Sequence, residues 1–247
     1  MTATATAGKR DRRFWLLSAL VLAALAVLVT LGTWQVRRLA WKEGLIARIE
    51  ARMAAAPVPL AAAEQAFAAS GDVDYQPVTL TGHFEHAGEQ HFFATHKGAS
   101  GYYVYTPLRL PDGRAILVNR GFVPFDRKDP ATRAEGQVEG DVEIAGLARN
   151  PLAEKPSGVY DNDPAKNIYY WKDRQAMARA AGLDPARLLP FFVDADDAPN
   201  PGGWPMGGVT LVSLPNNHLQ YAVTWYGLAL ALVGVYLFWI IQARRKG

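Results

Sequence analysis

Two long apolar segments without a charged residue lie near the two ends of the 247-residue chain. They cover residues 14–36 and 219–241. Since roughly 20 apolar residues in a helix span a hydrocarbon core of about 30 Å, each segment predicts one transmembrane helix. Trp15 and Trp34 bracket the first segment, and tryptophan rings are typical of membrane interfaces. The sequence therefore predicts an integral membrane protein with two anchors in a lipid bilayer.

Basic residues lie outside both apolar segments, at the two ends of the chain. They are Lys9, Arg10, Arg12, Arg13, Arg244, Arg245 and Lys246. Two spans place both termini on one side of the membrane, and basic flanks favour the cytoplasmic side. We therefore expect residues 1–13 and 242–247 to be cytoplasmic and residues 37–218 to be periplasmic.

The first segment is expected to remain as an anchor and not to be cleaved as a signal sequence. Signal sequences have an apolar region of ~7–15 residues, and no small-x-small cleavage site follows this segment. The short basic start leaves no room for a mitochondrial presequence, which favours a bacterial inner membrane. Arg37, Arg38 and Lys42 follow the first segment on the predicted outer side, so the topology rule does not explain them.

Between the anchors, the apolar period changes from helical to alternating. A helix is expected to continue over 37–56, and an alanine-rich stretch predicts a second helix over 60–69. Strands are predicted at 78–84, 91–95, 103–108, 115–119, 137–148, 168–171, 191–193 and 209–214. A hairpin turn is expected at 87–90, and Asp173 and Gly182 delimit a short helix. These elements predict a mainly β domain, an antiparallel barrel or sandwich with a few short helices.

The composition excludes several classes of function. The chain has no cysteine, which removes thiol nucleophiles, zinc–thiolate sites and iron–sulfur clusters. Its formal net charge of +3 is too small and too scattered for nucleic-acid binding. It contains no nucleophile elbow, HExxH, P-loop or GxGxxG motif, so we do not expect an enzyme.

His218 lies directly before the second apolar segment. Neutral imidazole binds heme iron well, and heme, which is partly apolar and partly anionic, suits a membrane interface. In the competing interpretation, His218 and the two preceding asparagines cap the helix and meet lipid headgroups. The residues alone favour the cap.

Trp34, Arg37 and Arg38 lie where the first predicted helix leaves the membrane. An aromatic belt and lipid phosphates explain them without a specific ligand. Alternatively, the guanidinium groups meet heme propionates or the acidic surface of a partner protein. Here too the residues alone favour the simpler interpretation.

Four histidines, His83, His86, His91 and His96, form a second candidate group. Across a hairpin, two of them would meet and bind copper or zinc. However, His83 and His86 face opposite sides of a strand, and no recognised ligand spacing accompanies them.

Two other polar groups in the β domain are ambiguous. Arg120 ends an apolar strand, where an arginine either binds a ligand or, more often, ties loops together. Asp194, Asp196 and Asp197 resemble half of a calcium loop but lack its glycine and terminal glutamate, so a solvated loop is expected.

Three motifs together resemble one family. They are Gly32-Thr33-Trp34-Gln35 through Trp41-Lys42, Val118-Asn119-Arg120-Gly121-Phe122-Val123-Pro124, and Asn216-Asn217-His218-Leu219-Gln220-Tyr221-Ala222-Val223-Thr224-Trp225. The chain resembles the Surfeit-locus-one (Shy-one) family of cytochrome oxidase assembly proteins from about residue 14 to 243. Phe122 stands where many members carry tryptophan, and residues 150–205 match only loosely.

The resemblance implies a role in the maturation of heme-copper cytochrome c oxidase, at subunit I during delivery of heme a. Heme A synthase is a further candidate partner. Bacterial members resemble heme a carriers, which implies that His218 is an iron ligand. Trp34, Arg37 and Arg38 at the exit of the first helix, and Tyr221 in the second helix, are then expected to help bind the heme. The first predicted helix contains no histidine as a second axial ligand.

Three hypotheses therefore stand side by side. The protein carries heme a to oxidase subunit I, or it is a scaffold that stabilises subunit I without binding heme. In the third, it is a periplasmic metal carrier that uses the histidines from His83 to His96.

Overall fold

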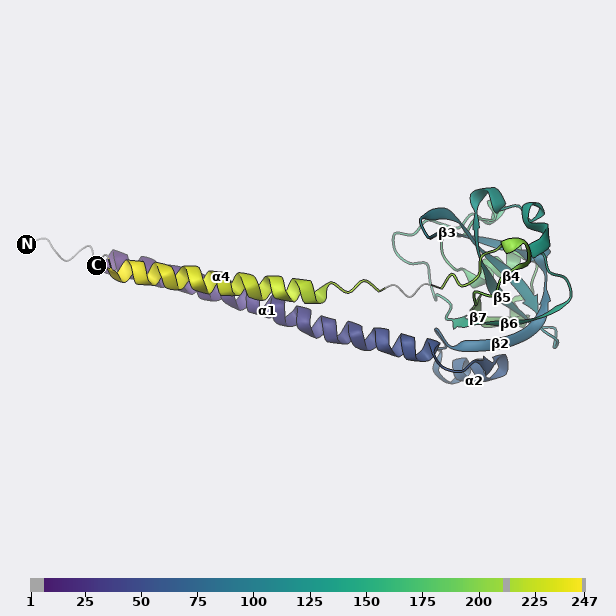
Figure 1. Cartoon of the computed structure of the whole chain (residues 1–247), viewed down its shortest axis with the longest axis horizontal. Helices are drawn as coiled ribbons and strands as arrows, with labels where there is room; N and C mark the ends of the chain where they lie inside the picture. The colour runs from purple at the N-terminus through teal and green to yellow at the C-terminus, as the bar shows by residue number, and fades with distance from the viewer. Residues whose placement is uncertain (1–6, 211–213, 246–247) are drawn as a thin grey trace, which may run out of the picture. The chain divides into compact units, whose positions relative to one another are not determined.

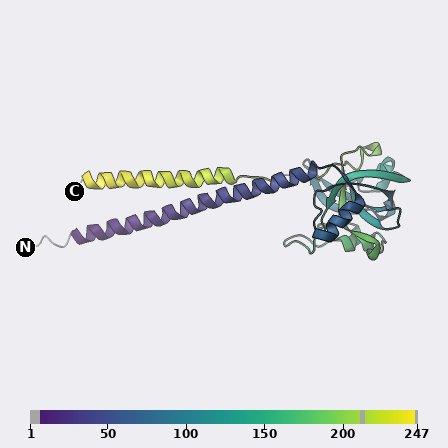
Figure 2. The same cartoon turned by 90° about the horizontal axis from the view of Figure 1, so that it is seen from below.

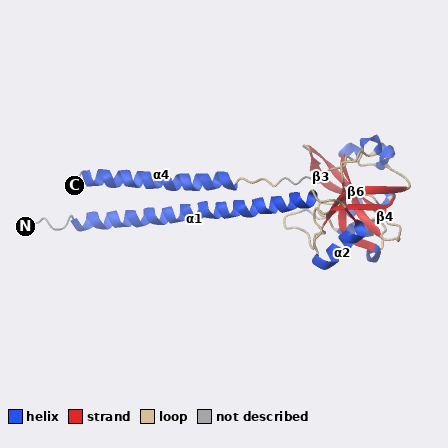
Figure 3. Ribbon diagram, turned by 60° about the horizontal axis from the view of Figure 1, so that its bottom comes forward, coloured by secondary structure: helices blue, strands red, loops and turns tan. Residues whose placement is uncertain are grey.

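The computed structural model of the chain describes residues 7–210 and 214–245 (Figures 1 and 2). It divides into a helical unit, drawn from residues 1–48 and 213–247, and a β-rich unit of residues 49–212. Figure 3 shows that the strands belong to the β-rich unit and not to the segments that form the two longest helices. Two membrane helices flanking a mainly β domain confirm the predicted fold class.

Two long helices account for the predicted anchors. Helix α1 covers Ala7–Met53 and helix α4 covers His218–Arg245, and both are long and apolar enough to cross a membrane. Helix α1 continues beyond its apolar segment, as predicted, and ends before Pro57 and Pro59, which cannot donate backbone hydrogen bonds.

Helices α1 and α4 contact each other in antiparallel order. Near one end, the rings of Phe14 and Trp239 stack with centroids 5.7 Å apart. Further along α1, Thr33 Oγ1 lies 3.1 Å from the hydroxyl of Tyr226. Gly32 permits this approach, because a Cβ there would lie 2.9 Å from the Tyr226 ring.

Seven strands form the β-rich unit. They are β1 (Val58–Pro59), β2 (Pro77–Phe84), β3 (Gln90–His96), β4 (Ala99–Arg109), β5 (Ala115–Pro124), β6 (Asp141–Arg149) and β7 (Leu188–Ala195). The sheet order is β1-β2-β6-β7-β5-β4-β3. Two pairs, His83 with Arg109 and Phe84 with Leu108, join β2 to β4 and close a five-stranded barrel. The neighbours β1–β2 and β5–β7 are parallel, so the expected all-antiparallel pairing is wrong at these two places.

Strand β5 lies between β7 and β4 in the sheet and is buried on both faces. Ile116 and Val118 pack into one apolar cluster, whereas Ala115 and Leu117 pack into the other. Helix α2 (Leu60–Ser70) packs against the first cluster, and helix α3 (Arg174–Ala180) against the second. Burial on both faces explains why this strand is apolar almost without interruption.

Both short helices begin and end as the sequence predicts. Gly71, at φ +69°, terminates α2. The side chain of Asp173 accepts a hydrogen bond from the backbone N–H of Ala176 at the start of α3, and Gly182 follows the helix at φ +71°.

Three local predictions fail. The expected hairpin over residues 87–90 is absent, because β2 pairs with β6 and the end of β4, while β3 pairs with β4. Residues 168–171 provide only isolated bridges. Of the strand predicted at 209–214, the described residues 209, 210 and 214 are not in a strand, and residues 211–213 lie outside the described part. Local alternation indicates an extended chain but does not identify its pairing partner.

Candidate functional site

His218 is the first residue of α4, and its ring contacts α1. The Nδ1–H of His218 donates a hydrogen bond to Oε1 of Gln35, with 2.7 Å between the two atoms. The ring is half-buried, and Gln35 is 8% exposed. Nε2, the other ring nitrogen, makes no hydrogen bond within the described ranges 7–210 and 214–245. The contact leaves one imidazole nitrogen available to a ligand.

Two aromatic candidates lie beside this histidine on different helices. The indole of Trp34 on α1 stands edge-on to the His218 ring, with centroids 6.4 Å apart and planes at 86°. Tyr221 follows His218 by three residues on α4, which places the two on neighbouring positions of the helix surface. Their side chains are 54% and 53% exposed, respectively. Both rings are therefore accessible to lipid or to a bound apolar molecule.

The arginine candidates follow Gln35 within the next turn of α1. Both Arg37 and Arg38 are exposed, and the guanidinium carbon of Arg38 lies 3.9 Å from the centroid of the Trp41 ring. No hydrogen bond or ion pair joins either arginine to His218 among the residues that the structure describes. Thus the structure brings His218, Gln35 and Trp34 together, whereas Arg37 and Arg38 are exposed and Arg38 packs on Trp41.

Lys42 provides a further tie between the same two segments. Its Nζ donates a hydrogen bond to the carbonyl oxygen of Pro215, three residues before α4 begins. This contact and the His218–Gln35 bond lie at the same end of the helix pair. They fix the chain that leads into α4 beside the exit of α1.

The residues at this end fit a heme with one histidine ligand. The donor set comprises one imidazole nitrogen that has no partner among the described residues, an exposed indole beside it, and the exposed guanidinium groups of two arginines in the next turn of α1. Imidazole coordinates heme iron, and guanidinium groups bind propionate carboxylates. His218 is the only histidine of the sequence in residues 1–48 and 213–247, so these segments of one chain offer a single imidazole to a ligand.

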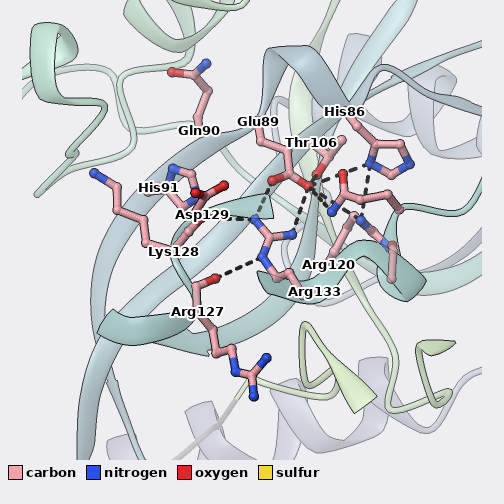
Figure 4. Close-up of polar contacts among 12 residues, drawn as sticks. His86, Glu89, Gln90, His91, Thr106, Arg120, Arg127, Lys128, Asp129 and Arg133 are labelled. Atoms are coloured by element: carbon pink, nitrogen blue, oxygen red, sulfur yellow. Dashed lines mark hydrogen bonds and ion pairs between the residues drawn. The ribbon is translucent and has the colours of Figure 1, made fainter. Parts of the chain in front are cut away.

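Arg120, the ambiguous arginine of the second motif, belongs to a buried network in the β-rich unit (Figure 4). It is 2% exposed and donates to the backbone oxygen of Gly136 and to Oδ1 of Asn200. Its Nη1 lies 3.6 Å from Oε1 of Glu89. Arg120 therefore ties loops together, which is the structural interpretation of this motif.

Glu89 is the acidic centre of that network. Arg133 donates to both of its carboxylate oxygens, at 3.2 and 2.5 Å. Burial alone raises the pKa of Glu89, but contacts with His86 and Arg133 and the charge of Arg120 outweigh it and hold the pKa at about 2. The carboxylate remains ionised and neutralises buried guanidinium groups.

The four histidines of the β-rich unit are engaged separately. His86 lies beside Arg120 and Glu89, and its Nε2 lies 2.8 Å from the carbonyl oxygen of Val138. The rings of His91 and His96 pack against Tyr102 and Phe122. Among the described residues, no group of three or more histidine, aspartate or glutamate side chains is placed to hold a metal ion. This geometry gives no support to a metal carrier.

Asp194 corrects the expectation of a solvated acidic loop. It is 3% exposed and accepts hydrogen bonds from Asn119 at 2.9 Å, Thr210 at 2.7 Å and Arg149 at 3.3 Å. Asp196 and Asp197, by contrast, are exposed as expected. The strand pairing of β7 with β5 and β6 brings the partners of Asp194 from distant parts of the chain.

Gln35 and Glu89 were not identified from the sequence as partners of other residues. A carboxamide within an otherwise apolar segment is a signal for Gln35, since polar groups in membrane helices usually find a partner. Glu89 gave no such signal, because it falls in a segment with turn-forming residues. Its partner Arg133 lies far along the chain.

Comparisons with known proteins identify the family that the three motifs resemble. Residues 22–230 match the sequence model of the SURF1 family. Surfeit locus protein 1 of Rattus norvegicus is 42% identical over 218 residues, which cover 81% of this chain and 68% of the rat protein. The Mus musculus protein is 40% identical over 244 residues, 92% of this chain and 76% of its own length. A SURF1-like protein of Drosophila melanogaster is 32% identical over 220 residues, 81% and 70% of the two chains.

Proposed function

Because the chain belongs to the SURF1 family, we propose that it is a membrane-bound assembly factor for heme-copper cytochrome c oxidase. It assists the delivery of heme a to subunit I and is not an enzyme. Heme a is its cargo, which it binds transiently and releases. Heme A synthase is the candidate donor, and subunit I is the acceptor.

The observation that carries this proposal is the open nitrogen of His218. Its Nδ1 is engaged by Gln35, while Nε2 has no partner among residues 7–210 and 214–245. The ring lies at the end of a helix that is able to cross a membrane. A heme bound here would have its apolar part in lipid and its propionates near Arg37 and Arg38.

Heme content of the purified protein tests the proposal. The full chain is expressed in cells that make heme a, purified in detergent, and its heme is measured by absorption spectroscopy. His218→Ala is expected to lower the heme content at least tenfold. His83→Ala is the matched control, because this histidine is exposed in the β-rich unit and is expected to leave heme content unchanged.

Equal heme content in the His218→Ala and unmodified proteins would remove His218 as the ligand. If subunit I co-purifies with the protein and no preparation contains heme, the scaffold function replaces the carrier function. The two functions are thus separated by one purification with two measurements.

Topology is tested by cysteine labelling, which the cysteine-free chain permits without background. We propose that the β-rich unit is periplasmic and that both termini are cytoplasmic. Asp161→Cys, at a side chain 90% exposed, is expected to react with an impermeant maleimide in intact spheroplasts. Ala243→Cys, near the C-terminus, is expected to react only after the membrane is opened. The reverse pattern would invert the topology.

A further inference from the structure

We propose that Gln35 is a positioning residue that sets the tautomer and the orientation of His218. The inference rests on the proposed function, since it matters only if His218 binds iron. It concerns a residue of this chain and can be tested without heme.

The direction of the hydrogen bond decides which ring nitrogen keeps a lone pair. Oε1 of Gln35 is an acceptor, so the proton of a neutral His218 ring lies on Nδ1. A neutral imidazole has a single N–H, and Nε2 then carries the free lone pair. Iron coordination requires this lone pair. Gln35 therefore holds the ring in the tautomer that binds iron through Nε2.

Gln35, the hydrogen-bond acceptor of His218, is buried. Gln35 is 8% exposed, although it lies between the exposed side chains of Trp34 and Val36. Its carboxamide faces α4, and water has little access to replace it. The Trp34 indole, perpendicular to the His218 ring with centroids 6.4 Å apart, adds a second neighbour from α1. The buried amide therefore defines the proton position on the ring, and the indole lies beside it.

Contacts on both sides of the pair hold the two helices in this register. Thr33 meets Tyr226 at 3.1 Å, and the absence of a side chain at Gly32 lets the Tyr226 ring approach α1. Lys42 donates to Pro215 beyond His218. Because the register is fixed independently, Gln35 is available to orient the ligand and is not the only link between the helices.

The first test reads the tautomer in heme-free protein. The full chain in lipid nanodiscs is labelled with ¹⁵N in its histidine rings, and His218→Gln identifies the resonances of His218. The unmodified protein is expected to carry the proton on Nδ1. Gln35→Glu, which retains an acceptor, is expected to preserve this state. Gln35→Met, which has no acceptor of similar strength, is expected to move the population toward Nε2–H.

Gln220→Met is the matched control, since Gln220 is an exposed glutamine two residues after His218 on the same helix. It is expected to leave the tautomer unchanged. Two results would overturn the proposal: a proton on Nε2 in the unmodified protein, or the same tautomer in the unmodified and Gln35→Met proteins. The first result decides the question even if Gln35→Met does not fold.

The second test measures heme affinity, with heme a as the probe. Loss of a residue that orients a metal ligand typically lowers affinity about 10- to 100-fold, and this loss is expected for Gln35→Met. Gln35→Glu and Gln220→Met are expected to bind as the unmodified protein does. A changed tautomer with unchanged affinity would overturn the positioning role.

The two measurements test separate claims. The heme content tests whether His218 is the ligand, and the tautomer tests whether Gln35 orients its ring. If His218→Ala retains heme, the proposed ligand is wrong, whereas the tautomer measurement still reports whether Gln35 orients the ring. If His218→Ala loses heme and Gln35→Met does not, the ligand stands and the positioning role falls.

Discussion

The β-rich unit gathers its buried charges into networks, whereas the helical unit joins its polar side chains in single pairs. In the β-rich unit, Glu89 faces two arginines, and Asp194 accepts from three side chains. In the helical unit, Ser18 meets Tyr236, Thr33 meets Tyr226, and Gln35 meets His218. These helix pairs are neutral groups that join one helix to the other.

This difference distinguishes polar residues that stabilise the fold from polar residues that are available for function. A buried charge in the barrel is compensated by its neighbours, so its removal leaves an unpaired charge in an apolar interior. A neutral pair between membrane helices contributes little to stability. Of the three pairs, only Gln35–His218 includes an imidazole, which is a good ligand for heme iron. The helix ends therefore hold the candidate ligand-binding group, whereas the buried arginine network stabilises the barrel.

The largest expected effect is that of Glu89→Gln on the barrel. The substitution leaves the Arg133 and Arg120 guanidinium groups without their carboxylate and is expected to lower the free energy of unfolding by about 4 kcal/mol. Chemical denaturation of the full chain in detergent, followed by near-ultraviolet circular dichroism, measures the change.

Asp161→Asn provides the control, because Asp161 pairs with Lys155 on the surface and is 90% exposed. It is expected to change stability by less than about 1 kcal/mol. If the two substitutions had similar effects, the buried network would not stabilise the barrel, and the contrast between the units would be lost.

Acid is expected to destabilise the barrel through His91. Burial lowers the pKa of His91 from 6.5 to about 4, and the charges of Lys128 and Arg133 act in the same direction against the attraction of Glu89. The unfolded chain therefore takes up a proton below pH 6.5 that the folded chain excludes until about pH 4. Stability is expected to fall by about 2 kcal/mol from pH 6.5 to 5.

Denaturation curves at both pH values test this assignment. His91→Gln is expected to remove that part of the loss, whereas His83→Gln, at an exposed histidine, is expected to retain it. Glu89 contributes little in this range, because its stabilising effect is lost only as the pH falls from its ordinary pKa of 4.5 through its folded pKa of about 2. An unchanged pH dependence in His91→Gln would show that another group binds the proton.

The smallest expected effect is that of Tyr236→Phe in the helical unit. It removes the hydroxyl that donates to Oγ of Ser18 at 2.5 Å. Hydrogen bonds between membrane helices contribute about 0.6 kcal/mol on average, and a loss of this size is expected. Unfolding in mixed detergent micelles measures this loss of stability. Tyr226→Phe tests a second neutral pair in the same way. A loss of stability comparable to that of Glu89→Gln would contradict the interpretation that neutral pairs between these helices contribute little to stability.

Much of the architecture follows from local pattern. Charge-free apolar length predicts α1 and α4, proline ends α1, and Asp173 with Gly182 delimits α3. The strands are predicted where alternation is strong, as in β2. The hairpin between β2 and β3 is wrong because adjacent strands in sequence need not pair, and the decisive closure joins His83 and Phe84 to β4.

The candidate site, too, is predicted from the sequence only in part. Order and spacing of the motifs predict the SURF1 family, which the comparisons confirm, and they single out His218 and Trp34. The predicted bacterial origin, the arginine contacts with heme and the heme itself stay predictions. Arg120 illustrates the limit, because its motif does not reveal the buried carboxylate that it faces.

The two membrane helices, the β-rich domain between them and the family follow from the amino-acid sequence, because hydropathy, alternation and motif order are local properties of the chain. Which polar groups meet follows from the packing of the folded chain. Gln35 and His218, or Glu89 and Arg133, are distant in sequence and become partners when helices or strands pack. Their pairing depends on register and burial, and these are properties of the folded chain.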